Sequence, residues 1–464
     1  MEIYPFVYPS LQQFYITLFF VIPAMKTYRY ILAAAAAFFL CNSSFSQEKW
    51  SLEKCITHAR ENNLQIKQQE IMVEQAGNEL LASKMKYVPS VNASMNHNLS
   101  WGRSVNLNDL EIIENQMSQS TSLNLSASIP LFEGMRKQNT VKSQIKQLEI
   151  AGVNVEKLKN EISLAVARGY LQVLLGYEME KSAVESCNSL QEQVDRCRNM
   201  VEAGSLAYSS LLELEAQLAN ERVQVVTAKN NLRSNILSLA QLLDIEDYSN
   251  FSIEVPETGQ LVLSLPEEDV AQIYDMAVSM PEIRGAELAV EQSRLQYRIQ
   301  KGAALPTLSF SAGYGTYYSN NQETPFFSQF DNNRNPSMGF GLSIPIFNNL
   351  RNSTSIKNAR LNVKSKETEL GITRQNLLKE IQQAYNDALA GFEKFTAAKQ
   401  NLASARESFN YSQEKFNAGM LSGTDYTIAK TNLSKAESEC IQSKFQYIFQ
   451  LKVLDYYKNV PLTL

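Results

Sequence analysis

The residue types that carry most metal and nucleophilic chemistry are scarce in this chain of 464 residues. It has two histidines, His58 and His97, and five cysteines, at positions 41, 55, 187, 197 and 440. A zinc site or a catalytic triad gathers histidine, cysteine and carboxylate side chains, and no stretch of the sequence offers such a set. A phosphate-binding loop for nucleotides is also missing from the sequence. We therefore expect no catalytic residue, no metal site and no cofactor, and hence no enzyme.

Charge and composition narrow the class of protein further. The chain carries 43 Lys and Arg against 48 Asp and Glu, a formal net charge of −5, so no basic surface for nucleic acid is expected. Gly (18 residues) and Pro (13 residues) are rarer than their usual shares of about 7% and 5%. Few helix breakers in so long a chain favour long helices.

The N-terminal part of the chain has the pattern of an export signal. A basic segment from Met25 is followed by an apolar, alanine-rich run at 31–41 and by Ser44-Phe45-Ser46, as in a secretory signal peptide. Residues 1–46 are therefore expected to be an upstream extension and a cleaved signal peptide, with either Met1 or Met25 as the true start. A membrane anchor is the alternative, but proline and basic residues interrupt the apolar stretch.

The cysteines are expected to act as packing residues. Exported proteins with a disulfide framework space their cysteines closely and evenly, whereas these are scattered through helical sequence. Cys187 and Cys197 would lie about 15 Å apart along a helix, which is too far for a disulfide. A lipid anchor on Cys41 remains open, although Phe39 and Leu40 before it are not the small residues that processing prefers.

The two halves of the mature chain repeat each other at a nearly constant spacing. The matching pieces are Ile129-Pro130-Leu131-Phe132 with Ile344-Pro345-Ile346-Phe347 and Ala203-Gly204 with Ala418-Gly419, both 215 residues apart, and Pro89 with Pro306, 217 apart. This spacing is far above the roughly 20–50 residues of solenoid repeats. We predict a first repeat over 47–243, a junction over 244–266 and a second repeat over 267–464.

Four segments alternate between apolar and polar residues, as β-strands do. They cover about 90–101 and 121–131 in the first repeat and about 307–318 and 337–347 in the second. Period-two patterning over about ten residues is typical of membrane β-barrel strands. A soluble β-sandwich would alternate in the same way. The almost uncharged polar face, and aromatic residues such as Trp101 and Phe132 near the strand ends, favour the membrane barrel.

Four long helices are expected, two after the strands of each repeat. They cover about 136–202, 207–243, 351–417 and 423–458. Two of them run for roughly 65 residues without proline, on the order of 100 Å of helix. The other two carry a heptad seam of apolar residues, which in the first repeat comprises Leu211, Leu214, Leu218, Val225, Leu232, Ile236, Leu239 and Leu243. Polar faces beside so narrow a seam indicate helices packed sideways into a single-layer wall, with water on both sides.

Four membrane strands cannot close a barrel, because single-chain bacterial barrels start at eight strands and lipid does not tolerate an open sheet edge. Three copies would supply twelve strands and twelve helices in a closed cyclic assembly. The predicted fold is therefore mainly α-helical with membrane β-structure: a trimeric 12-stranded outer-membrane β-barrel continuous with a 12-helix periplasmic α-barrel.

On these features the chain resembles the TolC-like outer membrane efflux protein family over roughly 48–458. The resemblance is carried by the duplicated unit, the Trp50-Ser51-Leu52-Glu53 opening, the prolines before the first strands, the Ile-Pro-Leu/Ile-Phe exits and the two Ala-Gly turns. It implies a homotrimer in outer-membrane lipid, with its helical barrel in the periplasm. The implied partners are a periplasmic adaptor (membrane fusion) protein and an inner-membrane transporter of the RND or ABC class.

The resemblance also assigns roles to residues at the helix-hairpin turns. Gly204, Leu206, Gly419 and Leu421 match the hairpin tips where the adaptor docks; the alternative is that they are ordinary hairpin residues. Asp425 matches an aspartate that narrows the periplasmic gate, and Ser209 and Ser210 hold the matching places in the first repeat. Helix capping is the alternative role for Asp425. The next acidic position of the family is Ile428 in this chain, which puts a double acidic ring in doubt.

The function that follows is passive export through an outer-membrane channel-tunnel of a tripartite efflux or type I secretion system. An inner-membrane transporter would drive it through the adaptor. The alternative is a structural or adhesive coiled-coil protein of the outer membrane, which would explain the heptads but not the strands. The polar lumen does not indicate whether the cargo is a drug, a metal, a peptide or a protein.

Overall fold

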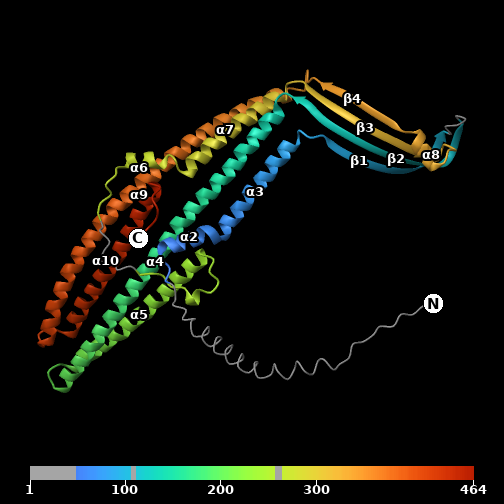
Figure 1. The fold of residues 1–464 in the computed structure, drawn as a ribbon. Helices are drawn as coiled ribbons and strands as arrows, with labels where there is room; N and C mark the ends of the chain where they lie inside the picture. The colour runs from blue at the N-terminus through green and yellow to red at the C-terminus, as the bar shows by residue number, and fades with distance from the viewer. Residues whose placement is uncertain (1–48, 106–110, 256–263) are drawn as a thin grey trace, which may run out of the picture.

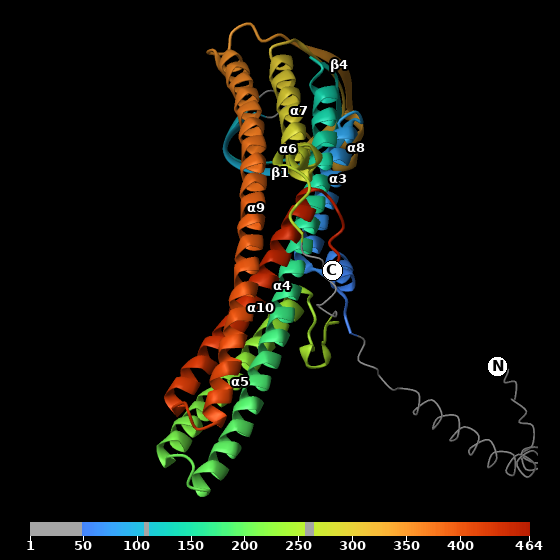
Figure 2. The ribbon, with the colours of Figure 1, turned by 90° about the vertical axis from the view of Figure 1, so that its left-hand side faces the viewer.

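The computed structural model of the protein describes residues 49–105, 111–255 and 264–464. The predicted signal peptide over 1–46, Cys41 and residues 256–263 of the junction lie outside the described residues. The described part is elongated, with a β-sheet at one end and the turns of two long helical hairpins at the other (Figures 1 and 2).

Both repeats contain the same sequence of elements. The first comprises α2 (Leu52–Asn62), α3 (Leu64–Met85), β1 (Ser90–Val105), β2 (Ile112–Glu133), α4 (Arg136–Glu202) and α5 (Tyr208–Leu242). The second comprises α6 (Val270–Ala277), α7 (Pro281–Gly302), β3 (Thr307–Ser319), β4 (Asn335–Ser343), α9 (Arg351–Asn417) and α10 (Gly423–Tyr457). A 3₁₀ turn, η1 (Tyr248–Asn250), lies in the junction, and a short helix, α8 (Phe326–Asn332), lies between β3 and β4.

The four strands form one antiparallel sheet in the order β1-β2-β3-β4. Their register confirms the alternation seen in the sequence. Leu125 of β2 lies opposite Ala93 on one side and Tyr314 on the other, so apolar residues share one face. Ser126 lies next to Gly313 on the opposite, polar face.

β4 ends at Ser343, four residues before the end expected at 347. Proline has no backbone N–H to donate to a ladder, and Pro345 lies two residues after Ser343, in the segment expected to continue the strand. The equivalent Pro130 lies within β2, where the register shifts between Pro130 and Phe132. Equal motifs in the two repeats therefore end their strands differently.

The helices form a single layer, as the narrow seams predicted. Near the sheet the neighbours across the layer are α3, α4, α7 and α9, and farther from it they are α5, α4, α10 and α9 (Figure 2). Each long helix, α4 or α9, therefore spans both levels, while shorter helices flank it. Seam residues Leu214, Leu239 and Leu243 are fully buried, while Val225 and Ile236 are half-buried.

Both long helices begin at the same tight turn. Two successive residues before each helix have positive φ: Gly134 (61°) and Met135 (64°) before α4, and Asn349 (53°) and Leu350 (64°) before α9. Gly134 is required for a second reason, because a Cβ there would clash with the carbonyl oxygen of Gly302 at the end of α7. The sheet is thus joined to the helical layer through close backbone contacts.

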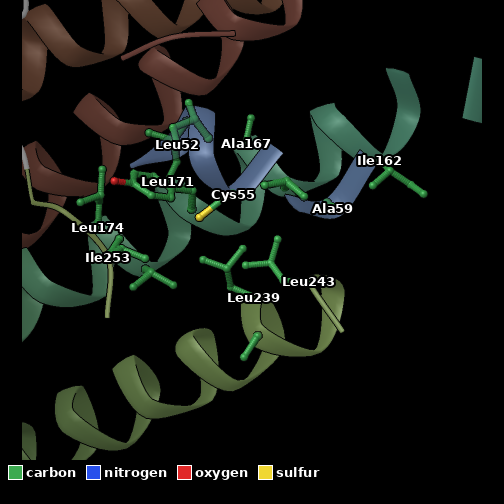
Figure 3. Packing of buried hydrophobic residues seen from close by; sticks show 14 of the residues in the cluster. Leu52, Cys55, Ala59, Ile162, Ala167, Leu171, Leu174, Leu239, Leu243 and Ile253 are labelled. Carbon is green, nitrogen blue, oxygen red and sulfur yellow. The ribbon is translucent and has the colours of Figure 1, made fainter. Parts of the chain in front are cut away.

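The largest core lies at the middle of the helical layer, where α2 and the C-terminal end of α5 pack on α4 (Figure 3). Trp50 and Ile253 form a parallel β-bridge there, and the hydroxyl of Tyr170 donates to the carbonyl oxygen of Glu254 at 2.6 Å. Ser51 caps α2, its Oγ accepting from the backbone N–H of Lys54 at 3.2 Å. These contacts tie the junction between the repeats to the first repeat.

The four cysteines of the described chain are free thiols. Cys55 and Cys197 are fully buried, whereas Cys187 and Cys440 are half-buried. Burial raises the pKa of the Cys55 thiol to about 12. Cys55, Cys187 and Cys197 pack within apolar clusters, as the sequence analysis expected, whereas lysine and arginine side chains lie near Cys440.

Candidate functional site

The candidate site is the end of the molecule farthest from the sheet, where the α4–α5 and α9–α10 hairpins turn side by side (Figures 1 and 2). Gly204 and Gly419 have φ of 74° and 73°, a conformation that glycine adopts without steric cost. After Gly204 the backbone N–H of Ser205 donates to the Met200 carbonyl at 2.8 Å, and Met420 donates to Lys415 at the same distance. Both helices therefore end in the same glycine-dependent C-cap.

The two leucines assigned to adaptor docking are half-buried rather than fully exposed. Leu206 and Leu421 pack against a tip core that includes Leu214, Phe416 and Tyr426. Other apolar side chains are more open at the tip, notably Met420 (74% exposed) and Tyr208 (62%). The apolar surface available for docking therefore includes residues that the sequence analysis did not single out.

Asp425 is exposed in the first turn of α10 and takes part in capping it. Ser422 is the N-cap residue, and its Oγ accepts from the backbone N–H of Asp425 at 3.1 Å. The same hydroxyl donates to Asp425 Oδ2 at 2.8 Å. A carboxylate in this position also interacts favourably with the helix dipole. The structure therefore gives Asp425 a capping role, while its carboxylate stays accessible to solvent.

Of the two serines, Ser209 is exposed and Ser210 is half-buried against the other hairpin. A Cβ on Gly423 would lie 3.4 Å from the Cα of Ser210 and 2.7 Å from Oε2 of Glu213. The hydroxyl of Thr424 donates to the same Glu213 oxygen at 3.1 Å. The first turns of α5 and α10 thus touch directly.

Two further side-chain contacts join the hairpins. Nε2 of Gln193, a fully buried side chain, donates to Oδ1 of Asn417 at 3.2 Å, and the hydroxyls of Ser186 and Ser434 lie 3.3 Å apart. Sequence reasoning missed these residues and Glu213. No local pattern marks them, because each contact joins side chains more than 200 residues apart.

Lys430 lies in α10, five residues after Asp425, and is a buried basic residue of the tip. Its side chain is 5% exposed, and Nζ lies 5.2 Å from the ring centroid of Phe409. Burial lowers the pKa of this ammonium group, against the opposing effect of Glu437 and Glu221. Burial of the nearby Tyr426 hydroxyl raises its pKa to about 12.

A large hollow runs along the helices on the side of the tip that faces the sheet. It has a volume of about 1490 Å³ and is lined from α4, α5, α9 and α10. Most of the lining side chains are neutral amides and hydroxyls, such as Gln217, Asn231, Ser434 and Gln442, with few charges among them. Apolar side chains, among them Leu171, Phe445 and Phe449, line the rest of it.

The described residues contain no group of three or more His, Cys, Asp or Glu side chains placed to hold a metal ion. In the same part of the chain, no helix is both long enough and apolar enough to cross a membrane.

Comparison with known proteins places this geometry in a family. A family model described as "Outer membrane efflux protein" matches residues 55–244 and 273–454. The outer membrane protein TolC of Escherichia coli is 22% identical over 344 residues, covering 71% of this chain and 68% of TolC. The solved structure of CusC superposes with a TM-score of 0.75 at 18% identity, covering 89% of this chain and 92% of CusC. The Campylobacter jejuni CmeC outer membrane channel superposes with a TM-score of 0.73 at 18% identity, covering 88% of this chain and 85% of CmeC.

The family model covers both repeats and leaves out only the N-terminus, the junction and the C-terminal end. The solved structures share the fold over nearly the whole described chain. The chain therefore belongs to the outer membrane efflux protein family, as an outer-membrane export channel protein and not an enzyme.

Proposed function

We propose that three copies of this chain form a closed tunnel, with a 12-stranded barrel in the outer membrane and a 12-helix barrel in the periplasm. The observation that carries the proposal is the open sheet. Within the described residues β1 and β4 are each paired on one side only, and one face of the sheet is apolar from edge to edge. In lipid such edges must be paired, and a second copy of the chain offers the complementary edge.

The helical layer supports the same assembly. Its two outer edges are α3 with α5 on one side and α9 on the other. Both edges carry exposed apolar side chains, among them Ile71, Leu81, Val223, Leu361 and Ile372. Apolar surface of this kind marks an interaction site, and contact between the edges of neighbouring copies would bury it.

The tunnel acts as a passive export conduit from the periplasm to the exterior, driven by an inner-membrane RND or ABC transporter through an adaptor. The adaptor docks on the hairpin tips around Gly204, Leu206, Gly419 and Leu421. Asp425, Ser209 and Ser210 line the periplasmic gate. Three copies of the exposed Asp425 carboxylate around one axis would favour cations over anions at the entrance. The relatives TolC, BepC and the pyoverdine export protein OpmQ are consistent with such a role.

A reconstitution experiment tests the proposal. The protein, purified in detergent and added to a planar bilayer, should conduct ions in discrete steps. A structural or adhesive coiled-coil protein of the outer membrane, the alternative function, would give no conductance. Absence of steps from protein that is folded by circular dichroism would contradict the tunnel.

A further inference from the structure

The two repeats are related by two fixed sequence offsets that predict contacts between helices. Elements before the second strand of each repeat (α3, β1) correspond to α7 and β3 at an offset of 217, and later elements (β2, α4) correspond to β4 and α9 at 215. Glu70 of α3 pairs with Lys159 of α4 at 3.2 Å. The two offsets carry these residues to Glu287 and Arg374, which pair across α7 and α9 at 2.7 Å.

The same offsets reproduce the register of the sheet. Met95 of β1 lies opposite Leu123 of β2. Adding 217 to the residue number of Met95 and 215 to that of Leu123 gives Ala312 and Met338. These two residues lie opposite each other in β3 and β4. The two offsets therefore hold for side-chain ion pairs and for strand register alike.

A different contact joins the repeats to each other, and it has no copy within the part of the chain that the structure describes. It includes β2 with β3 and α4 with α7 near the sheet, and α4 and α5 with α10 farther from it. At the offset of 215, β2 and α4 correspond to β4 and α9, which form the open edge at one side of the molecule. At the offset of 217, β3 and α7 correspond to β1 and α3, which form the open edge at the other side. Only a second copy of this chain can bring these two edges together.

We propose that β4 of one copy pairs with β1 of the next in the register that the β2–β3 pairing dictates. Ala127 lies opposite Ala312, so Leu342 should lie opposite Met95 of the neighbouring copy. Ser122 lies opposite Tyr317, so Ser337 should lie opposite Ser100. This inference rests on the proposed assembly and specifies its interface residue by residue.

The side chains fit this register. It places apolar Leu342 beside apolar Met95, and serine beside serine on the polar face, whereas a slip of one residue would set apolar against polar throughout. The apolar face that runs across the four strands of one chain would thus continue unbroken into the next chain.

The helices give matching pairs at the same interface. Nε2 of Gln292 donates to Oε1 of Gln147 at 2.7 Å between α7 and α4; the offsets carry this pair to Gln75 and Asn362. Both are amides that can make the same bond, and both are exposed in the single chain.

A second pair behaves in the same way. Nε2 of Gln296 donates to Oγ of Ser143 at 3.0 Å, and Ser143 is 1% exposed. The corresponding residues, Glu79 and Asn358, are exposed in the single chain. An amide and a carboxylate can form the equivalent hydrogen bond, so the neighbouring copy supplies the cover that these residues lack here.

Disulfide trapping tests the register. In a background with the four cysteines at 55, 187, 197 and 440 replaced by serine, the double variant Ser100→Cys/Ser337→Cys brings two thiols opposite each other. Directly opposed residues have Cα atoms about 4.5–5.5 Å apart, within the range of a disulfide. Mild oxidation of the assembled protein in its membrane should convert most of the chains to covalent dimers and trimers on a non-reducing gel, and reduction should return them to monomers.

The matched control is Ser94→Cys/Ser337→Cys, which keeps the same residue types on the same polar face. It displaces one thiol by six residues, about 20 Å along the strand, so it should yield few cross-links. Gln75→Cys/Asn362→Cys tests the helical level independently and should also cross-link.

The possible failures can be told apart by the mass of the uncross-linked protein. If native mass spectrometry finds three chains but the Ser100 and Ser337 pair stays reduced, or the Ser94 control cross-links equally well, the register is wrong while the tunnel stands. If it finds only monomers, both the proposed register and the proposed tunnel are wrong.

Discussion

In each hairpin a glycine lies where the two helices come into close contact, and replacing it should destabilise the hairpin. Gly176 of α4 faces α5, where a Cβ would lie 3.1 Å from Cδ1 and 3.3 Å from Cα of Leu232. The Cα belongs to the backbone, so it moves only if the helices separate. The repeat places Gly391 against Tyr447 in the same way, at 3.2 Å from Cδ2.

The magnitude follows from two opposing effects. Alanine is a better helix former than glycine by roughly 0.5–1 kcal/mol, while overpacking a filled contact costs about 1–3 kcal/mol. We therefore expect Gly176→Ala to lower the free energy of unfolding by about 1 kcal/mol. Gly152→Ala is the matched control in the same helix, because a Cβ there meets nothing within 4 Å; it should raise the free energy of unfolding by about 0.5–1 kcal/mol.

Guanidinium unfolding of the detergent-solubilised protein, followed by far-ultraviolet circular dichroism, measures both variants against the parent. The midpoint should fall for Gly176→Ala and rise for Gly152→Ala. Equal upward shifts for the two variants would refute the claim that the α4–α5 packing is closed at Gly176.

Three further predictions concern the tip and the core. Asp425→Ala should raise single-channel conductance or weaken block by multivalent cations, whereas Ser422→Ala, which removes the cap but keeps the carboxylate, should not; equal effects would assign Asp425 to capping alone. Burial lowers the pKa of Lys430 below its ordinary 10.5, so the unfolded chain binds more protons and the lysine's contribution to stability should improve as pH rises towards 10.5. Lys430→Met should therefore raise the unfolding midpoint at pH 7 and flatten this pH dependence in chemical denaturation; a lower midpoint at pH 7 would show that the charge stabilises the tip. The Cys55 thiol, with a pKa of about 12, should resist maleimide at pH 8 in folded protein and react rapidly in denaturant; rapid labelling of the folded protein would place it outside the core.

The duplication and the periodicities made much of the fold predictable. The two proline-free runs became α4 and α9, and the leucine seam is the buried face of α5. Gly204 and Gly419 could be placed in turns because a positive φ follows directly from residue type. These features depend on neighbouring residues in the sequence, so the sequence displays them.

Other features depend on contacts that the sequence does not display. The helix α8 between β3 and β4 is held by Gln329, which is 1% exposed and whose Nε2 donates to the carbonyl oxygens of Ser319 and Thr324. At the tip, the Glu213–Thr424 bond and the half-burial of Leu206 arise from the second hairpin. The sequence offers a capping role for Asp425 only as the alternative to its gate role, because an aspartate at this position suits both.

The central claim is that one chain supplies a third of a closed tunnel. Native mass spectrometry of the membrane-extracted, detergent-solubilised protein tests it most directly. A complex with three times the mass of the mature chain is the predicted result. A folded protein that is monomeric, or whose copies associate in any number other than three, would contradict it.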